Sequence, residues 1–310
     1  MINTVTLNPA VDRILYIPSF TRNITNRIRS TKDYLGGKGT HVSINLKLLN
    51  TASRAFGIAY GDTGKKVIQF LKDFQIDVQF IYEDKGETRT NYLVIEDTND
   101  CSIIADRGMD LAEGILERLI HQMRMNLKEE DYLVLSGDAS NCSDPMVYNR
   151  IMKELSDKRL RVFLDTSGES LMECIRSSPY LIKPNLDELS YISKKNLSGD
   201  EEIIQALKEL DPYQVEIIAV SLGGDGSLVK YRDEFYRVYP PRVRVSNTIG
   251  CGDCYLAGLV YGIHEGKNIA ETLRIATAAS AAAAESNTSV GFDTDRAKQL
   301  ENLVTIKKLA

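Results

Sequence analysis

The strongest constraint on the fold is an alternation of short apolar runs with helical segments, which begins near residue 131. The apolar runs are rich in β-branched residues and are predicted strands, while the segments between them have the spacing of amphipathic helices. Strands are predicted at 132–135, 162–164, 180–182 and 216–220, and helices at 145–158 and 201–209. This βαβ pattern favours a mostly parallel sheet with helices on both faces, and ligands of such sheets gather beyond the carboxyl ends of the strands.

The last third of the chain changes character. Strands are predicted at 227–231, 235–238 and 243–245, separated by turn residues and prolines, which favours antiparallel strands at one edge of the sheet. Two helices are predicted at 253–264 and 269–285, and the alanine content of the second indicates close helix packing.

Two earlier stretches, 12–34 and 89–104, do not fit the βαβ pattern. The second alternates apolar and polar residues, as a strand with one buried face does. We expect both stretches to form a small sheet that stands off the core. Because no long linker is visible, we expect residues 1–310 to form one domain.

Charge and composition exclude several function classes. A net charge of -5 argues against broad binding to nucleic acid, which requires a basic face. The longest run of small apolar residues, 276–284, is far shorter than the ~20 residues that a membrane span needs, and no signal peptide is visible. Five cysteines at irregular spacings do not describe a disulfide framework. We therefore expect a cytoplasmic protein with no nucleic-acid or membrane partner.

The strongest local signal is Gly250-Cys251-Gly252-Asp253, between a predicted strand and a predicted helix. Glycines at this point allow backbone N–H groups to converge on an anion, and the helix N-terminus adds partial positive charge. Asp253 would lie where a transferred phosphoryl group arrives and could accept the proton of a hydroxyl. The alternative is that Asp253 only caps the helix after a glycine turn.

A second glycine motif, Gly36-Gly37-Lys38-Gly39, precedes the helical pattern 42–49. It is not a Walker A loop, because that loop has four residues between its first glycine and Gly-Lys-Ser/Thr. A close approach of the backbone to a polar ligand remains plausible here.

Two further segments follow predicted strands. In the first, Lys183-Pro184-Asn185 precedes Glu188, and the alternative to a ligand role is that Asn185 and Glu188 form a capping pair. In the second, the glycine-rich run 221–226 is either a nucleotide-contacting loop or a simple turn.

The pair Cys251 and Cys254 forms Cys-x-x-Cys, but a zinc site would need a second pair or regularly spaced histidines. His41, His121 and His264 are scattered, so a metal or redox role is disfavoured. Because helix N-termini lower thiol pKa values, Cys251 is expected to be a reactive thiol.

Taken in order, these segments resemble the ribokinase-like carbohydrate kinases, specifically the phosphofructokinase B branch that contains 1-phosphofructokinase and tagatose-6-phosphate kinase. Six segments carry the resemblance over about 240 residues: 6–12, 36–39, 88–91, 183–188, 221–223 and 250–253. The resemblance implies an α/β fold, a three-layer αβα domain with a mostly parallel central sheet and a small β-sheet lid from about 12–34 and 89–104. It also implies a homodimer formed through the lid.

The resemblance further implies ATP-dependent phosphorylation of a ketohexose phosphate, with Asp253 as catalytic base and Gly250, Cys251 and Gly252 as the anion hole. The substrate-binding residues would be Asp12, Gly36, Gly37, Lys38, His41, Arg89 and Asn91. ATP would contact Lys183, Asn185, Ser221, Gly223, Gly226 and Asn287, and Asn185 and Glu188 would hold Mg²⁺ through water.

Three segments depart from the branch. Cys251 and Cys254 replace its usual alanine and serine, His41 replaces its usual asparagine, and Asp138-Ala139-Ser140 replaces its usual Ser-Leu-Pro. A kinase for an unphosphorylated sugar or nucleoside is an alternative, against which Arg89 argues. A non-catalytic sugar-phosphate sensor is another, against which Gly252 and Asp253 argue.

Overall fold

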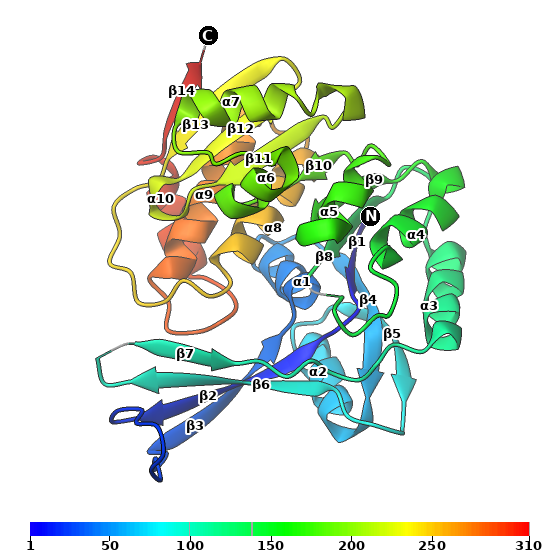
Figure 1. Ribbon diagram of the computed structural model, residues 1–310, viewed down its shortest axis with the longest axis vertical. Helices are drawn as coiled ribbons and strands as arrows, with labels where there is room; N and C mark the ends of the chain where they lie inside the picture. The colour runs from blue at the N-terminus through cyan, green and yellow to red at the C-terminus, as the bar shows by residue number, and fades with distance from the viewer. Residues whose placement is uncertain (99, 138, 310) are drawn as a thin grey trace.

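A large twisted sheet runs through the centre of the computed structural model, which describes residues 1–98, 100–137 and 139–309 (Figure 1). Its strand order is β14-β13-β12-β11-β10-β9-β8-β1-β4-β5. The bounds are β1 Ile2–Thr6, β4 Ser53–Tyr60, β5 Asp77–Glu83, β8 Tyr132–Ser136, β9 Arg161–Asp165, β10 Leu181–Ile182, β11 Ile217–Ser221, β12 Ser227–Tyr231, β13 Glu234–Tyr239 and β14 Thr305–Leu309. Pairing is parallel from β11 to β5 and antiparallel from β11 to β14.

Helices cover both faces of this sheet (Figure 1). They are α1 Lys38–Leu48, α2 Gly61–Asp73, α3 Glu113–Asn126, α4 Val147–Glu154, α5 Gly168–Ile175, α6 Leu186–Ser193, α7 Asp200–Lys208, α8 Cys251–His264, α9 Ile269–Ala284 and α10 Thr294–Glu301. One core cluster joins the sheet to α3 through α7, and another joins the opposite face to α1, α8, α9 and α10. The predicted three-layer αβα fold class is therefore confirmed.

Helices α8 and α9 pack at unusually close range, as the alanine-rich sequence indicated. A Cβ atom at Gly258 would lie 2.4 Å from the Cα atom of Ala276, so only glycine fits at this crossing. The close crossing holds the N-terminus of α8 at the carboxyl edge of the sheet, where the site lies.

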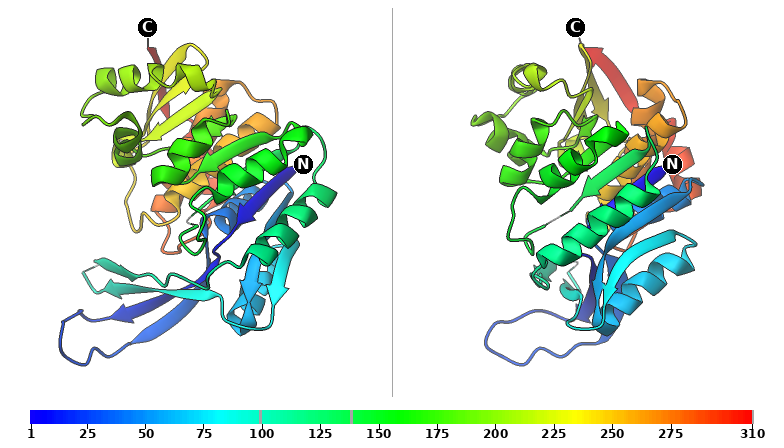
Figure 2. Two further views of the ribbon diagram at one scale, coloured as in Figure 1. Left: turned by 45° about the vertical axis from the view of Figure 1, so that its right-hand side comes forward. Right: turned by 90° about the vertical axis from the view of Figure 1, so that its right-hand side faces the viewer.

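A second, four-stranded sheet stands off the large one, in the order β3-β2-β6-β7 (Figure 2). Its strands are β2 Ala10–Ile17, β3 Ser30–Gly36, β6 Arg89–Glu96 and β7 Cys101–Ile104. These are the two stretches that did not fit the βαβ pattern. The register places Asp12 beside Asn91 on the neighbouring strand.

The structure has elements that the sequence analysis did not predict, among them β1, β4 and β5, and it differs further at two places near the antiparallel edge of the sheet. Residues 243–245 form no strand but an irregular segment after Pro240 and Pro241, because a proline has no N–H to donate to a sheet. Strand β14 was not predicted, and it pairs with β13 at the edge of the sheet. Across the described residues, no helix combines the length and apolar character that crossing a bilayer requires.

Candidate active site

A cleft of about 340 Å³ opens at the carboxyl ends of β1, β8 and β9, between the large sheet and the small one. Most of the substrate-binding and catalytic residues expected from the sequence line it. These are Asp12, Gly37, Lys38, His41, Arg89, Asn91, Gly250, Gly252 and Asp253, together with Lys183 from the expected nucleotide set. Residues from five separate parts of the chain therefore meet in one cleft, as the topology of a parallel sheet favours.

Asp253 is the third residue of α8 and is only 6% exposed. The helix begins after Gly250, whose φ of 79° is in the left-handed region and whose Cβ, if present, would lie 2.3 Å from the Ser289 carbonyl oxygen. Because Gly250 occupies the N-cap position, the alternative that Asp253 caps this helix is wrong. The first turn of α8 faces the cleft with the positive end of the helix dipole.

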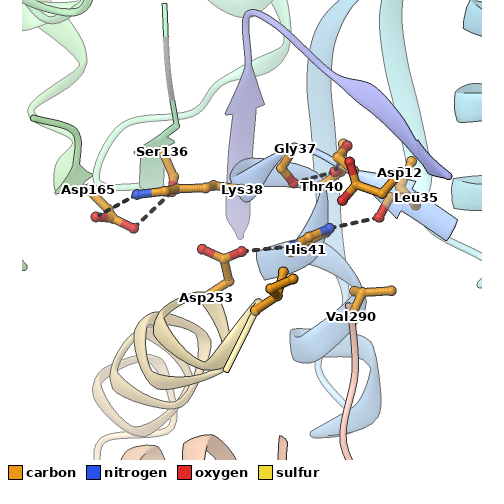
Figure 3. A network of polar contacts seen from close by, with 12 residues as sticks. Asp12, Leu35, Gly37, Lys38, Thr40, His41, Ser136, Asp165, Asp253 and Val290 are labelled. Atoms are coloured by element: carbon orange, nitrogen blue, oxygen red, sulfur yellow. Dashed lines mark hydrogen bonds and ion pairs between the residues drawn. The ribbon is translucent and has the colours of Figure 1, made fainter. Parts of the chain in front are cut away.

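His41 contacts Asp253 directly. The Nδ1 atom of its ring lies 2.7 Å from Oδ2 of Asp253, and Nε2 lies 2.7 Å from the carbonyl oxygen of Leu35 (Figure 3). Burial by itself would lower the pKa of His41, but the hydrogen bond and the attraction to Asp253 outweigh it and raise the pKa. Because both ring nitrogens are occupied, a hydrogen bond from His41 to a sugar would require one of these contacts to break.

A second charged cluster centres on Asp165, at the end of β9. Its Oδ1 atom lies 3.5 Å from Nζ of Lys38, and Ser136 donates to Oδ2 at 3.4 Å (Figure 3). The same Oδ1 atom lies 3.3 Å from Nζ of Lys183. Asp165 is 2% exposed, and burial would raise its pKa, but attraction to the two lysines outweighs burial and lowers it. One carboxylate therefore holds two ammonium groups at the floor of the cleft.

Asp165 was not among the site residues predicted from the sequence. The signal that points to it is its position directly after an apolar strand of a parallel sheet, beside the neighbouring strand end at Lys183. A search of the residue after every predicted strand for ligand-binding side chains would have found Asp165.

The small sheet contributes the outer wall of the cleft. Asn91 donates from Nδ2 to Oδ1 of Asp12 at 2.8 Å, and a Cβ atom at Gly36 would lie 2.4 Å from that same oxygen, so the glycine makes room for the carboxylate. Arg89 donates to the carbonyl oxygens of Asn8 and Asp106 at 3.2 and 3.1 Å. These bonds hold the guanidinium at the edge of the cleft.

A separate groove of about 580 Å³ lies on the other side of α8. It is lined mainly by glycine, proline and small side chains from the turn between β11 and β12, the segment after β13, and α9, including Ser221, Gly223 and Gly226 of the expected nucleotide set. Gly252 lines both this groove and the cleft. The N-terminus of α8 therefore stands where the two cavities meet.

Other expected residues lie apart. Asn185 and Glu188 form a capping box at the start of α6, and the negative charge of Glu188 also acts on Lys38. Asn287 lines a neighbouring pocket of about 490 Å³ with Arg244 and Glu285. Asp138 lies outside the described residues.

The cysteines in α8 are free thiols. Burial, and then the negative charge of Asp253, raise the pKa of Cys251 to about 11, so the expectation of a reactive thiol is wrong. The helix dipole does not compensate for the loss of water around the sulfur. Among the described residues, no three acidic, histidine or cysteine side chains gather in a way that could hold a metal ion.

A carboxylate beside a helix N-terminus, with lysines close by, suits the transfer of an anionic group to a hydroxyl. The sequence profile of the pfkB family carbohydrate kinases matches residues 5–294. The 1-phosphofructokinase of Bacillus subtilis (strain 168) is 33% identical over 92% of each chain, and the tagatose-6-phosphate kinase of Staphylococcus epidermidis (strain ATCC 12228 / FDA PCI 1200) is 30% identical over 90% of each. The structure of phosphofructokinase-2 from Escherichia coli superposes with a TM-score of 0.92 at 24% identity, covering 97% of this chain and 98% of that one, which shows a shared fold.

Proposed function

Because this chain belongs to the pfkB family of carbohydrate kinases, we propose that it transfers the γ-phosphoryl group of ATP to a hydroxyl of a ketohexose phosphate, giving a sugar bisphosphate and ADP. The observation that carries the proposal is the position of Asp253, at the N-terminus of α8 where the cleft and the groove meet. A group bound in one cavity can react there with a hydroxyl bound in the other.

Asp253 acts as the general base. Its carboxylate takes the proton from the acceptor hydroxyl as the sugar oxygen attacks phosphorus, and the bond between phosphorus and the bridging oxygen of ADP breaks. The backbone N–H groups of Gly250 and Gly252, with the dipole of α8, stabilise the charge on the transferred phosphoryl group.

The acceptor lies against the small sheet. Asp12 and Asn91, paired at 2.8 Å, offer oxygen and nitrogen atoms to the sugar hydroxyls. Arg89 and Lys38 supply positive charge for its phosphate, which favours a phosphorylated acceptor over a free sugar or a nucleoside. Gly37 lines the cleft, and Gly36 leaves room for the Asp12 carboxylate that faces the sugar.

ATP occupies the groove, with Ser221, Gly223 and Gly226 beside it and Lys183 near its phosphates. Asn185 and Glu188 carry the oxygen ligands that Mg²⁺ prefers. Because Oδ1 of Asn185 and Oε2 of Glu188 already accept the hydrogen bonds of the capping box, we expect Mg²⁺ to contact these residues through water. Mg²⁺ bound there would neutralise charge on the ATP phosphates. Asn287 would contact the nucleotide only from the neighbouring pocket.

The small sheet acts as a lid over the acceptor and as the contact between two copies of the chain. Strand β7 is an edge strand that exposes 57% of Ile103 and 56% of Ile104. Exposed apolar residues on an edge strand favour pairing with another sheet, and a second copy offers the same surface. Ile104→Asp should convert a dimer to monomers in analytical ultracentrifugation, and a monomeric wild-type protein would refute this part of the proposal.

The function is tested by coupled ADP release from Mg-ATP with a panel of acceptors. The panel contains fructose 1-phosphate, tagatose 6-phosphate, fructose 6-phosphate, free hexoses and nucleosides. We expect a clear rate with one phosphorylated ketose. A higher rate with a free sugar or nucleoside, or ATP binding without any turnover, would refute the proposed acceptor. Cell fractionation checks the cytoplasmic location that belongs to the same proposal.

A further inference from the structure

The contact between His41 and Asp253 has only a few possible arrangements of protons. The carbonyl oxygen of Leu35 can only accept a hydrogen bond, so Nε2 of His41, 2.7 Å away, must carry a proton. Nδ1 faces Oδ2 of Asp253 at 2.7 Å, and one proton must lie between these two atoms for the contact to be attractive. If that proton is absent, a lone pair of the ring faces a carboxylate.

We propose that His41 is a positioning residue for the catalytic base: its imidazolium form holds Oδ2 of Asp253 and leaves Oδ1 free to take the proton of the acceptor hydroxyl. Among the described residues, no hydrogen bond is formed by Oδ1. The inference rests on the proposed kinase function, because Asp253 needs orientation only if it acts as a base.

The charged groups around the ring favour the imidazolium. Asp253 on α8 and Asp12 on β2 both act on His41 and are both acidic. Lys38, on the same helix as His41, acts on Asp253 and Asp165, and β3 contributes only the neutral carbonyl of Leu35. Together these groups raise the pKa of His41 despite its burial. The positioning is therefore present below the ordinary histidine pKa and is lost as pH rises through the raised pKa of His41.

The group-transfer step balances with this arrangement. The acceptor hydroxyl gives its proton to Oδ1 of Asp253, its oxygen bonds to the γ-phosphorus, and ADP leaves with the electrons of the broken phosphorus–oxygen bond. His41 keeps both of its protons throughout, and so no proton passes between His41 and the substrate. An asparagine at this position can also donate one N–H to Asp253, but it cannot titrate.

The first test needs no catalysis. Proteins labelled with ¹⁵N-histidine contain three imidazoles, and the His41 signals are those lost in His41→Asn. We expect Nε2 to stay protonated across the pH range, and Asp253→Asn to lower the pKa of His41 by at least one unit, a tenfold loss of proton affinity. An unchanged pKa in Asp253→Asn, or a protonated Nδ1 with a bare Nε2, would overturn the proposal.

The second test compares pH profiles of kcat for the wild type, His41→Asn, His41→Gln and the exposed control His121→Asn. We expect the wild type and the control to lose activity at alkaline pH with the midpoint of the His41 titration. The Asn and Gln variants, whose side-chain amides can donate an N–H but cannot titrate, should both lack that alkaline limb. An identical limb in the variants refutes the inference, whereas an inactive wild type refutes the proposed function and leaves the titration test intact.

Discussion

The cleft proposed for the acceptor and the groove proposed for the nucleotide meet at the N-terminus of α8, yet they are built differently. The cleft is lined by ionised side chains, and its key members, Asp253 and Asp165, are buried and held by other charged groups. The groove is lined mostly by glycines, prolines and small side chains from loops and α9. The properties of the cleft depend on the positions of its charged side chains. The shape of the groove depends mainly on the path of the backbone.

This difference predicts how each cavity responds to substitution. Removing a charge from the cleft leaves its partners buried without compensation, so single changes there should have large effects. The groove loses little when one small side chain is shortened, and it is sensitive mainly to added volume. The following substitutions test this contrast, in order of decreasing effect.

The largest effect is expected for Asp253→Asn, which keeps the shape of the cleft but removes the base. Turnover should fall about a thousandfold, within the range typical of general-base catalysis. ATP affinity, measured by calorimetry, should change by less than about twofold, because the groove is untouched. Near-normal turnover in this variant would exclude Asp253 as the base.

Asp165→Asn should destabilise the fold at neutral pH, because Lys183 and Lys38 lose their shared counterion. Breaking a buried pair costs about 3 kcal/mol of unfolding free energy, measured in urea at pH 7. Because the pKa of Asp165 is lowered in the folded protein, its carboxylate stabilises the fold fully above the ordinary carboxyl pKa. This stabilisation is lost as pH falls through the lower native pKa. The difference between variant and wild type should therefore shrink toward pH 3.

The matched control for Asp165→Asn is Asp157→Asn, which breaks an exposed pair with Arg124. Exposed pairs contribute about 0.5 kcal/mol. Equal losses in the two variants would contradict the view that the cleft charges are held by burial.

On the groove side, Ser280→Leu should raise the KM for ATP about tenfold and leave the KM for the acceptor within about twofold. Ser280 lines the groove from α9, and the larger side chain would occupy space needed by the nucleotide. Ser280→Ala removes only a hydroxyl and should change neither constant appreciably. An acceptor KM that rises together with that for ATP would show that the two cavities are not separable.

The last prediction leaves turnover aside and concerns the thiol of Cys251, which lines the groove at the start of α8. With a pKa of about 11, about one thiol in a thousand is ionised at pH 8, so alkylation by iodoacetamide should be about a hundredfold slower than that of an ordinary thiol. Mass spectrometry of the labelled peptides measures the rate, with free glutathione as the reference. Labelling as fast as that of glutathione would restore the reactive-thiol expectation.

The sequence determined the features that depend on local spacing. The βαβ alternation, the two stretches of the small sheet and the glycines before α1 and α8 are all readable without coordinates, because strand and helix periodicity and positive φ angles are properties of neighbouring residues. The same rules failed at 243–245, where two prolines outweigh the β-branched residues that follow.

Tertiary structure alone decided which side chains act as partners. His41 and Asp253 are 212 positions apart, and Asp165 meets Lys38 and Lys183 from three different elements. Spacing along the chain carries no information on such contacts, because they depend on how separate strands and helices are brought to one edge of the sheet. The pKa of Cys251 was misjudged for the same reason: a helix N-terminus is visible in the sequence, whereas the burial that opposes it belongs to the folded molecule.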